Sequence, residues 1–211
     1  MTFWKGKGVD WRVALTITLH SIICVRSVLR LCCVFSDNKP MPRYVAFLRG
    51  VSPLNAKMPE LKACFEGAGF TNVRTVLSSG NVVFDERAAS NASLERKAES
   101  AMQNALGRTF YTIVRRVDYL LTLQTTDPYA AFVLPANAKR VVSFLREPRS
   151  SKLALPLESD GAHVLCVAGT EVFTAYIPNE KGPVFMTLIE KSFGADITTR
   201  TWETIRKCAA A

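Results

Sequence analysis

The sequence has few of the residues from which metal and nucleophilic sites are most often built. It contains two histidines, His20 and His163, and six cysteines without any C-x-x-C pair. A His/Cys zinc site is therefore not expected, because such sites need four ligands at close spacing. Irregular cysteine spacing also argues against a disulfide framework and favours a reducing compartment, so we expect a cytoplasmic protein.

Motifs of known chemistry are also missing. The chain has no G-x-S-x-G, no Walker loop and no G-x-G-x-x-G. Cys64 is expected in a hydrophobic core. His163 and Cys166 lie three apart on an expected strand and should face opposite sides of it, which excludes a Cys/His dyad. No catalytic residue or cofactor is predicted, and whether the protein is an enzyme stays open.

No run of eighteen uncharged apolar residues is present, because one histidine and two arginines interrupt Val13–Phe35. A membrane span is therefore not predicted. Met1–Pro40 has six Lys or Arg and two Asp or Glu, giving +4 of the net charge of +9. Three interpretations of it compete: an upstream extension of a protein that starts at Met41, a targeting or membrane-surface segment, and an amphipathic appendage. In each case we expect a poorly structured extension outside the fold.

From Met41 onward the pattern predicts a β-α-β-β-α-β unit. Arg43–Arg49 is apolar on both faces, which is typical of a central strand. Two helices are expected to bury one face each, the first through Leu61, Cys64, Phe65 and Ala68 and the second through Leu94, Ala98, Ala101, Met102 and Ala105. The other strands are expected at Asn72–Leu77, Val82–Asp85 and Phe110–Arg115. This order is that of the ferredoxin-like plait.

The second half repeats this order less clearly. After a short helix at Val117–Gln124 and a linker near Pro135, strands are expected at Lys139–Arg146, Ala162–Val167, Glu171–Ile177 and Ile197–Arg200. Helices are expected at Val184–Phe193 and Trp202–Ala209, and Glu147–Gly161 is expected to hold at most a short helix at Ser151–Leu155. The predicted class is α+β, with two ferredoxin-like halves in tandem at 41–135 and 136–211 after the extension at 1–40.

A resemblance to a known family rests on two stretches, RYVAFLRGVSPLNAKMPELKACFEGAGFTNVRTVLSSGNVVF and ITTRTWETIRKCA. From Met41 to nearly Ala211 the chain resembles the bacterial domain-of-unknown-function family 1697. The resemblance implies two α/β plait halves and no established activity. The motifs that recur in the family correspond to Leu48–Gly50, Asn55–Lys57, Ser79–Asn81 and Thr199–Trp202. Val51–Leu54 replaces a glycine-rich loop, which weakens the case for phosphate binding by exposed backbone amides.

The candidate site residues are polar or aromatic residues that fall at expected strand ends and in loops. Arg49, Asn55, Lys57 and Arg200 are predicted as anion contacts, Ser79 and Asn81 as polar groups that orient a ligand, and Trp202 as a stacking partner. Structural roles compete with these: an ion pair for Arg49, turn chemistry for Ser79 and Asn81, and helix anchoring for Trp202. In a plait, the segments of Arg49 and Ser79 are expected at opposite ends of the sheet, which argues against a single site.

Three functions are weighed on this basis. The first is binding of a small anionic or phosphate-bearing ligand between the two halves. The second is weak nucleic-acid binding, which the basic charge favours but the missing RNA-recognition motif does not. The third is a structural or oligomeric accessory role. The oligomeric state is not predicted.

Overall fold

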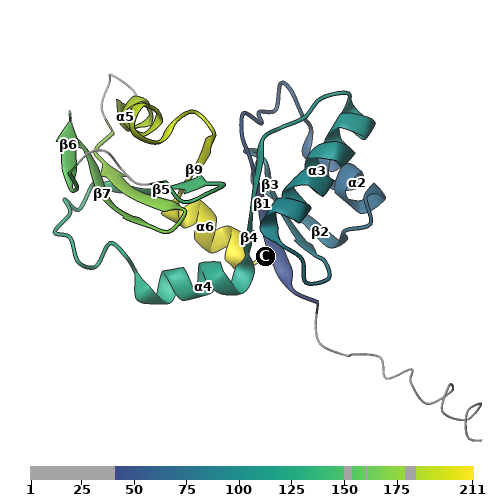
Figure 1. Cartoon of the computed structure of the whole chain (residues 1–211), viewed down its shortest axis with the longest axis horizontal. Helices are drawn as coiled ribbons and strands as arrows, with labels where there is room; N and C mark the ends of the chain where they lie inside the picture. Colours follow the sequence, from purple (N-terminus) through teal and green to yellow (C-terminus); the bar gives the residue numbers. More distant parts are fainter. Residues whose placement is uncertain (1–40, 150–153, 160, 179–183) are drawn as a thin grey trace, which may run out of the picture. The chain divides into compact units, whose positions relative to one another are not determined.

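The computed structural model describes residues 41–149, 154–159, 161–178 and 184–211 (Figure 1). The expected extension Met1–Pro40 lies outside these residues. Residues 41–211 belong to one compact unit. None of the helices in the described part of the chain is long and apolar enough to cross a membrane.

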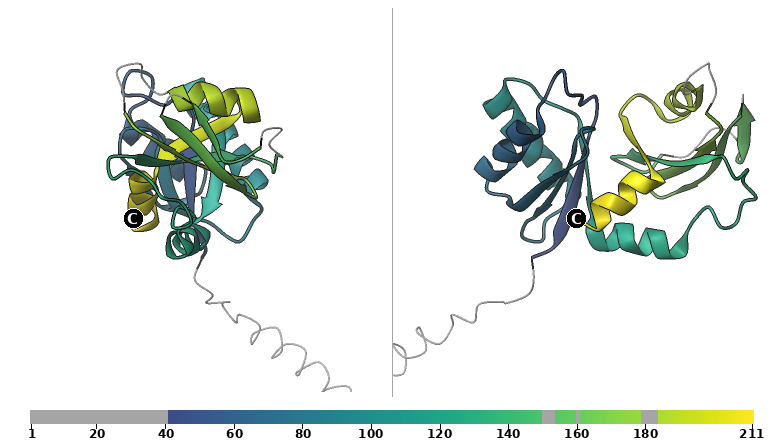
Figure 2. Two further views of the ribbon diagram at one scale, coloured as in Figure 1. Left: turned by 90° about the vertical axis from the view of Figure 1, so that its left-hand side faces the viewer. Right: turned by 180° about the vertical axis from the view of Figure 1, so that it is seen from behind.

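The first half contains the elements that its pattern predicts. They are β1 (Arg43–Leu48), α2 (Met58–Gly67), β2 (Thr71–Val76), β3 (Asn81–Asp85), α3 (Asn91–Leu106) and β4 (Thr112–Arg116). The strands form an antiparallel sheet in the order β2-β3-β1-β4. The two helices cover one face of this sheet (Figure 2). The first sheet thus places β1 in its interior, as two apolar faces require.

The second half forms another antiparallel sheet, in the order β6-β7-β8-β5-β9. Helix α4 (Val117–Thr126) precedes this half, whose elements are β5 (Lys139–Leu145), β6 (Leu157–Ser159), β7 (Ala162–Ala168), β8 (Glu171–Tyr176), α5 (Val184–Phe193), β9 (Ile197–Thr201) and α6 (Trp202–Ala209). The sequence did not predict β6, because a three-residue strand at a sheet edge needs little apolar character. The short helix expected at Ser151–Leu155 falls mostly outside the described residues.

Three hydrophobic clusters arrange these elements in layers. One lies between the first sheet and α2 and α3, and one lies between the second sheet and α5. The middle cluster joins the two sheets and includes side chains from α4 and α6. Figures 1 and 2 show the two sheets that it joins. The class is therefore α+β, with two antiparallel sheets that share an apolar interior.

Strand β1 contributes to two of these clusters, as predicted. Tyr44, Ala46 and Leu48 face the helices, whereas Val45 and Phe47 face the second sheet. The Phe47 ring stacks on Phe144 of β5, with ring centroids 4.6 Å apart and an interplanar angle of 13°. This aromatic pair connects the centres of the two sheets.

Local signals fix the helix ends. Helix α2 ends in a Schellman motif, with Gly69 at a φ of +83°. The Gly69 N–H donates to the Glu66 carbonyl at 2.9 Å, and the Phe70 N–H donates to the Phe65 carbonyl at 3.2 Å. Ser90 caps α3 by accepting from the Ser93 N–H at 3.2 Å. The buried face predicted for α2 is confirmed at Leu61, Cys64 and Phe65, with Ala68 half-buried.

The face predicted for α3 is confirmed at Leu94, Ala98 and Met102 and is wrong at Ala105, which is exposed. Ala105 belongs to the last turn of α3, where the side chain faces a hollow beside α2 rather than the sheet. Near the start of α3, Glu95 is buried although the apolar pattern did not include it, and the Val114 N–H donates to its carboxylate at 3.0 Å. Burial raises the pKa of Glu95.

Candidate functional site

The loop after β1 and the turn between β2 and β3 lie at the same end of the first sheet. Phe47 is paired with Asn81, and the Leu48 N–H donates to the Gly80 carbonyl at 2.8 Å. The prediction of opposite ends is wrong, because β1 and β3 are antiparallel neighbours and the end of one lies beside the start of the other. The geometric objection to a single site therefore falls away.

Gly80 allows the loop to approach this turn closely. Its φ is +72°, a region that costs other residues about 1–2 kcal/mol. A Cβ on Gly80 would also lie 2.7 Å from the Cβ of Val51, which is too close for a real contact. The turn therefore needs glycine for both conformation and space.

Arg200 on β9 joins the second half to this end of the first sheet. Its five N–H donors all have acceptors among the described residues, namely Asn81 Oδ1, Thr198 Oγ1 and the carbonyls of Thr199, Leu48 and Ser79. Burial lowers the pKa of Arg200 to about 10, so the guanidinium is still charged at neutral pH. With every donor engaged, Arg200 acts as a joint between the halves and has no free N–H for a ligand.

Asn81 and Ser79 hold this joint in place. Asn81 is fully buried, and its Nδ2 donates to the Val76 carbonyl at 2.8 Å and to the Ser79 hydroxyl at 3.1 Å. Its Oδ1 accepts from the Arg200 Nε. The amide thus closes the turn on one side and orients the guanidinium on the other.

Arg49 follows β1 and presents a more open guanidinium. Its backbone N–H donates to the Tyr111 carbonyl at 2.8 Å, which fixes the start of the side chain. Its Nη2 donates to Glu190 Oε1 of α5 at 3.0 Å, and within the described residues this is the only hydrogen bond of the guanidinium. The ion pair is partly exposed, and the other four donors of the guanidinium stay available to solvent or a ligand.

Asn55 and Lys57 lie farther along the same loop and serve it differently. The Ser52 N–H donates to Asn55 Oδ1 at 2.8 Å, and Asn55 Nδ2 donates to the Gly50 carbonyl at 2.7 Å. Asn55 therefore stiffens the loop that carries Arg49. Lys57 precedes α2 and is exposed, with its Nζ 3.9 Å from a Glu60 carboxylate oxygen.

Trp202 begins α6 and is buried. Thr201 caps this helix by accepting from the Thr204 N–H at 3.2 Å. The indole packs edge-on against Tyr129, with ring centroids 5.2 Å apart and an interplanar angle of 76°. Trp202 thus occupies the position of a helix anchor and does not present its ring face to solvent.

Arg49 and Arg200 both line a cavity of about 450 Å³ beside α5 and β9. Asn55, Lys57, Ser79, Asn81 and Trp202 do not line it. Tyr176 and Phe185 form an aromatic wall, stacked with centroids 4.5 Å apart and an interplanar angle of 24°. The cavity therefore combines a partly free cation with an apolar surface, a combination typical of sites for small amphipathic anions.

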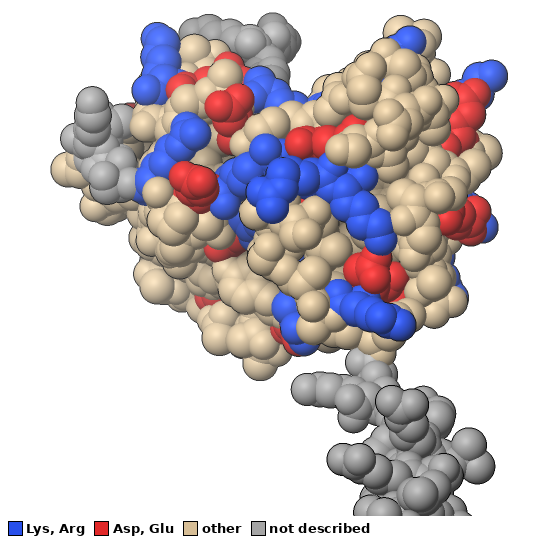
Figure 3. Space-filling model, turned by 45° about the vertical axis from the view of Figure 1, so that its right-hand side comes forward, with Lys and Arg blue, Asp and Glu red and all other residues tan. Residues whose placement is uncertain are grey.

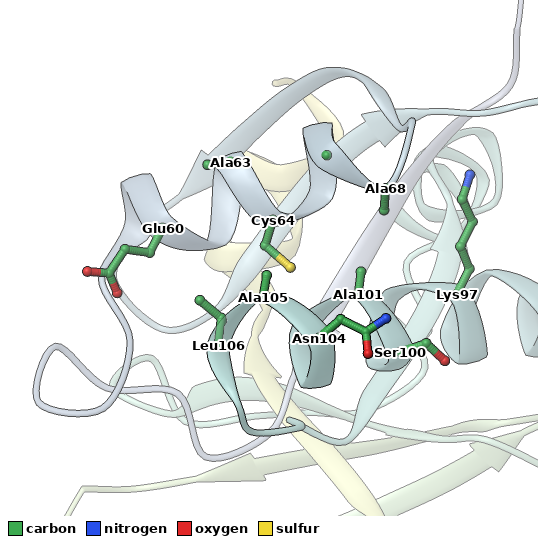
Figure 4. A pocket seen from close by; sticks show the side chains of 11 residues that line it. Glu60, Ala63, Cys64, Ala68, Lys97, Ser100, Ala101, Asn104, Ala105 and Leu106 are labelled. Atoms are coloured by element: carbon green, nitrogen blue, oxygen red, sulfur yellow. The ribbon is translucent and has the colours of Figure 1, made fainter.

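A larger hollow lies between α2 and α3, where Figure 4 shows Cys64 directed toward the gap. Small side chains such as Ala63, Ala101 and Ala105 line most of it. Burial raises the pKa of Cys64, so its thiol stays protonated and is a weak nucleophile. This hollow offers space without converging polar groups, and we do not assign it a function.

A buried ion pair that the sequence analysis missed connects the two sheets. Arg115 of β4 donates from Nε to Glu171 Oε1 of β8 at 2.7 Å. The Tyr119 hydroxyl donates to the other oxygen of Glu171 at 2.6 Å. The sequence contained one indication of this pair, because Arg115 follows Ile113 and Val114 in an apolar strand. A buried charge there is costly unless a countercharge pairs with it.

Strand β7 contains a bulge that overturns one expectation. His163 is paired with Ala175 and Cys166 with Phe173, so both lie on the face that Ala175 and Phe173 share. The prediction that they face opposite sides is wrong, because the register shifts between Val164 and Cys166. Burial raises the pKa of Cys166, which makes this thiol a poor nucleophile.

Comparisons with known proteins agree with this architecture. The family model described as "Protein of unknown function (DUF1697)" matches residues 41–173. A similar solved structure is that of the conserved bacterial protein SP0830 from Streptococcus pneumoniae, with 19% identity and a TM-score of 0.58. The match covers 81% of this chain and 97% of that one, and at this identity it shows the fold alone. None of the curated proteins matches the sequence.

Proposed function

Since the chain belongs to the family of proteins of unknown function DUF1697, a functional argument depends on its own site, and we propose that it binds a small anionic ligand beside Arg49. The observation that carries the proposal is the open guanidinium of Arg49 at the edge of a cavity. Most of that guanidinium's donors lack protein partners among the described residues. The cavity volume of about 450 Å³ falls in the range of small-ligand sites.

The surroundings hold Arg49 in position for this role. The Tyr111 carbonyl binds its backbone N–H, and Arg200 binds the carbonyl of Leu48, the residue just before it. Arg200 therefore serves the site as a support, and Asn81 serves it by orienting Arg200. A preorganised cation loses less conformational entropy when it binds an anion.

The aromatic wall narrows the class of ligand. Tyr176 and Phe185 offer an apolar surface next to the charge, so the favoured ligand joins a flat or aliphatic group to a phosphate or carboxylate. Glu190 occupies one donor of Arg49 and must give way to such an anion. We therefore regard the Arg49–Glu190 pair as a resident contact that the ligand replaces.

Isothermal titration with phenyl phosphate tests the proposal. Arg49→Gln should weaken binding about 10- to 100-fold, because a charge-assisted hydrogen bond contributes about 1.5–3 kcal/mol. Lys62→Gln is the matched control, since Lys62 also pairs with a glutamate, Glu66, at 3.7 Å but lies outside the cavity. Absence of binding to the unmodified protein, or equal affinity in the Arg49 variant, would sink the proposal.

A second candidate, weak nucleic-acid binding, is favoured by a band of Lys and Arg side chains across the face in Figure 3. Asp and Glu border this band, which limits the positive field. Binding of a short single-stranded RNA that falls steeply with salt would favour this candidate. Binding that is absent even at low salt would remove it.

We also propose that the two halves, 41–135 and 136–211, are two copies of the ferredoxin-like plait. The support is their matching strand order. We take β5, β7, β8 and β9 as the counterparts of β1, β2, β3 and β4. Across each sheet the strands then lie in the same order: second, third, first and fourth along the chain. Strand β6 extends the second sheet beyond this common pattern.

A further inference from the structure

The Arg49 cavity adjoins a second hollow of about 350 Å³ at the start of β5 and α6. Thr201 lines both hollows, so the second is a direct neighbour of the first. Three cationic side chains line the second hollow, Lys139, Arg140 and Arg206, against one acidic residue, Glu203. The far end of the cavity is therefore also positive.

Lys139 is the one of these three cations with the fewest partners. Arg140 lies 3.3 Å from an Asp127 oxygen, and Arg206 lies 3.8 Å from an oxygen of Glu203. Lys139 is exposed and has no carboxylate within ion-pair distance in the described part of the chain.

Strand register places Lys139 on the face of the second sheet that carries the aromatic wall. Lys139 is the direct cross-strand partner of Tyr176, and Val141, two residues on, is the partner of Thr201. Paired residues in antiparallel strands point to the same side. Lys139 therefore lies beside Tyr176, whereas Arg49 lies beside Glu190 of α5.

Arg49 and Lys139 lie near different turns of α5. Glu190 comes five residues after Phe185, which corresponds to about 8 Å along the helix axis. Phe185 stacks on Tyr176, the neighbour of Lys139. A molecule that reaches both cations must therefore cross the aromatic wall.

From this arrangement we infer that the ligand is elongated, with an acidic group at each end and an apolar middle. Arg49 binds one acidic group, Lys139 binds the other, and the middle lies on Tyr176 and Phe185. This inference rests on the proposed function, because it assumes that an anion binds Arg49. It goes further in assigning a second anchor and a length to the ligand. Phosphate and carboxylate are the two chemistries that fit both ends.

Linear alkane bisphosphonates of increasing chain length test the inference, each compared with the monophosphonate of the same chain by isothermal titration of the full chain. At one intermediate length the bisphosphonate should bind about tenfold tighter than its monophosphonate. Lys139→Gln should remove this advantage and leave monophosphonate affinity unchanged, whereas Lys62→Gln should change neither. A matching series of dicarboxylates and monocarboxylates then distinguishes the two chemistries.

The outcomes separate this inference from the proposed function. Monophosphonate binding that depends on Arg49, without a bisphosphonate advantage at any length, overturns the two-ended ligand and leaves the proposed function standing. A bisphosphonate advantage that survives Lys139→Gln also overturns it. If none of the phosphonates or carboxylates binds, both proposals fail.

Discussion

Two Arg–Glu pairs connect the first sheet to the second half, and they differ in exposure. Arg115 and Glu171 lie between the sheets with side-chain exposures of 5% and 1%. Arg49, which lines the cavity, and its partner Glu190 have side-chain exposures of 36% and 40%. The same pair of residue types therefore occurs once in an apolar interior and once in contact with water.

The difference in exposure indicates which of the two arginines is structural and which is suited to binding. In the interior, each charge depends on its partner, because removing one leaves the other without solvation. At the cavity edge, water and ions compensate for a lost partner, so the pair contributes little to stability and can be exchanged. The buried pair is thus structural, and the exposed pair is the one suited to binding.

The largest effect is expected when the buried pair is broken. Glu171→Gln should lower the free energy of unfolding by about 3–5 kcal/mol, because Arg115 would stay buried without its countercharge. Urea denaturation measures this loss, with Glu190→Gln as the control. A loss below about 1 kcal/mol in the Glu171 variant would contradict the structural role of the pair.

A smaller loss is expected from the second joint. Arg200→Ala should cost about 2 kcal/mol, because it leaves the Leu48 and Ser79 carbonyls and Asn81 without their donor. Denaturation should also show that Arg200→Lys fails to restore full stability, since lysine cannot reach this set of acceptors with a planar fork. Full stability in the lysine variant would show that charge alone is enough.

A still smaller effect is expected at the turn. Gly80→Ala should cost about 1–2 kcal/mol because of the positive φ, and the contact with Val51 places the cost in the upper part of this range. Combining it with Val51→Gly should be less damaging than the sum of the two single changes, because glycine removes the Cβ and Cγ2 of Val51 that the new Cβ would meet. Strict additivity of the unfolding free energies would show that the loop does not pack on Gly80 as described.

The sequence predicted the elements with clear periodicity and missed features that depend on long-range contacts. The two apolar faces of β1 correctly indicated an interior strand, and the helical spacing of Leu61, Cys64 and Phe65 correctly indicated a buried face. Strand β6 was missed because an edge strand of three residues carries almost no pattern. The bulge in β7 was missed because it changes the facing of side chains without changing their spacing in the sequence.

The candidate site was predictable only in part. Residue type and position at a strand end identified Arg49 and Arg200, and the structure places both at one cavity. The sequence could not distinguish them, because the number of free donors depends on acceptors from segments far apart in the chain. Lys139 was overlooked for a similar reason: its position beside Tyr176 follows from strand register.

The most direct test of the contrast between the two pairs is the phenyl phosphate affinity of Glu190→Gln. This variant should lose less than about 1 kcal/mol of unfolding free energy, because the pair is exposed. It should also bind phenyl phosphate up to about fivefold tighter, because the carboxylate that competes for Arg49 is gone. Unchanged or weaker binding, or a stability loss as large as that of Glu171→Gln, would contradict the assignment of the exposed pair to ligand exchange.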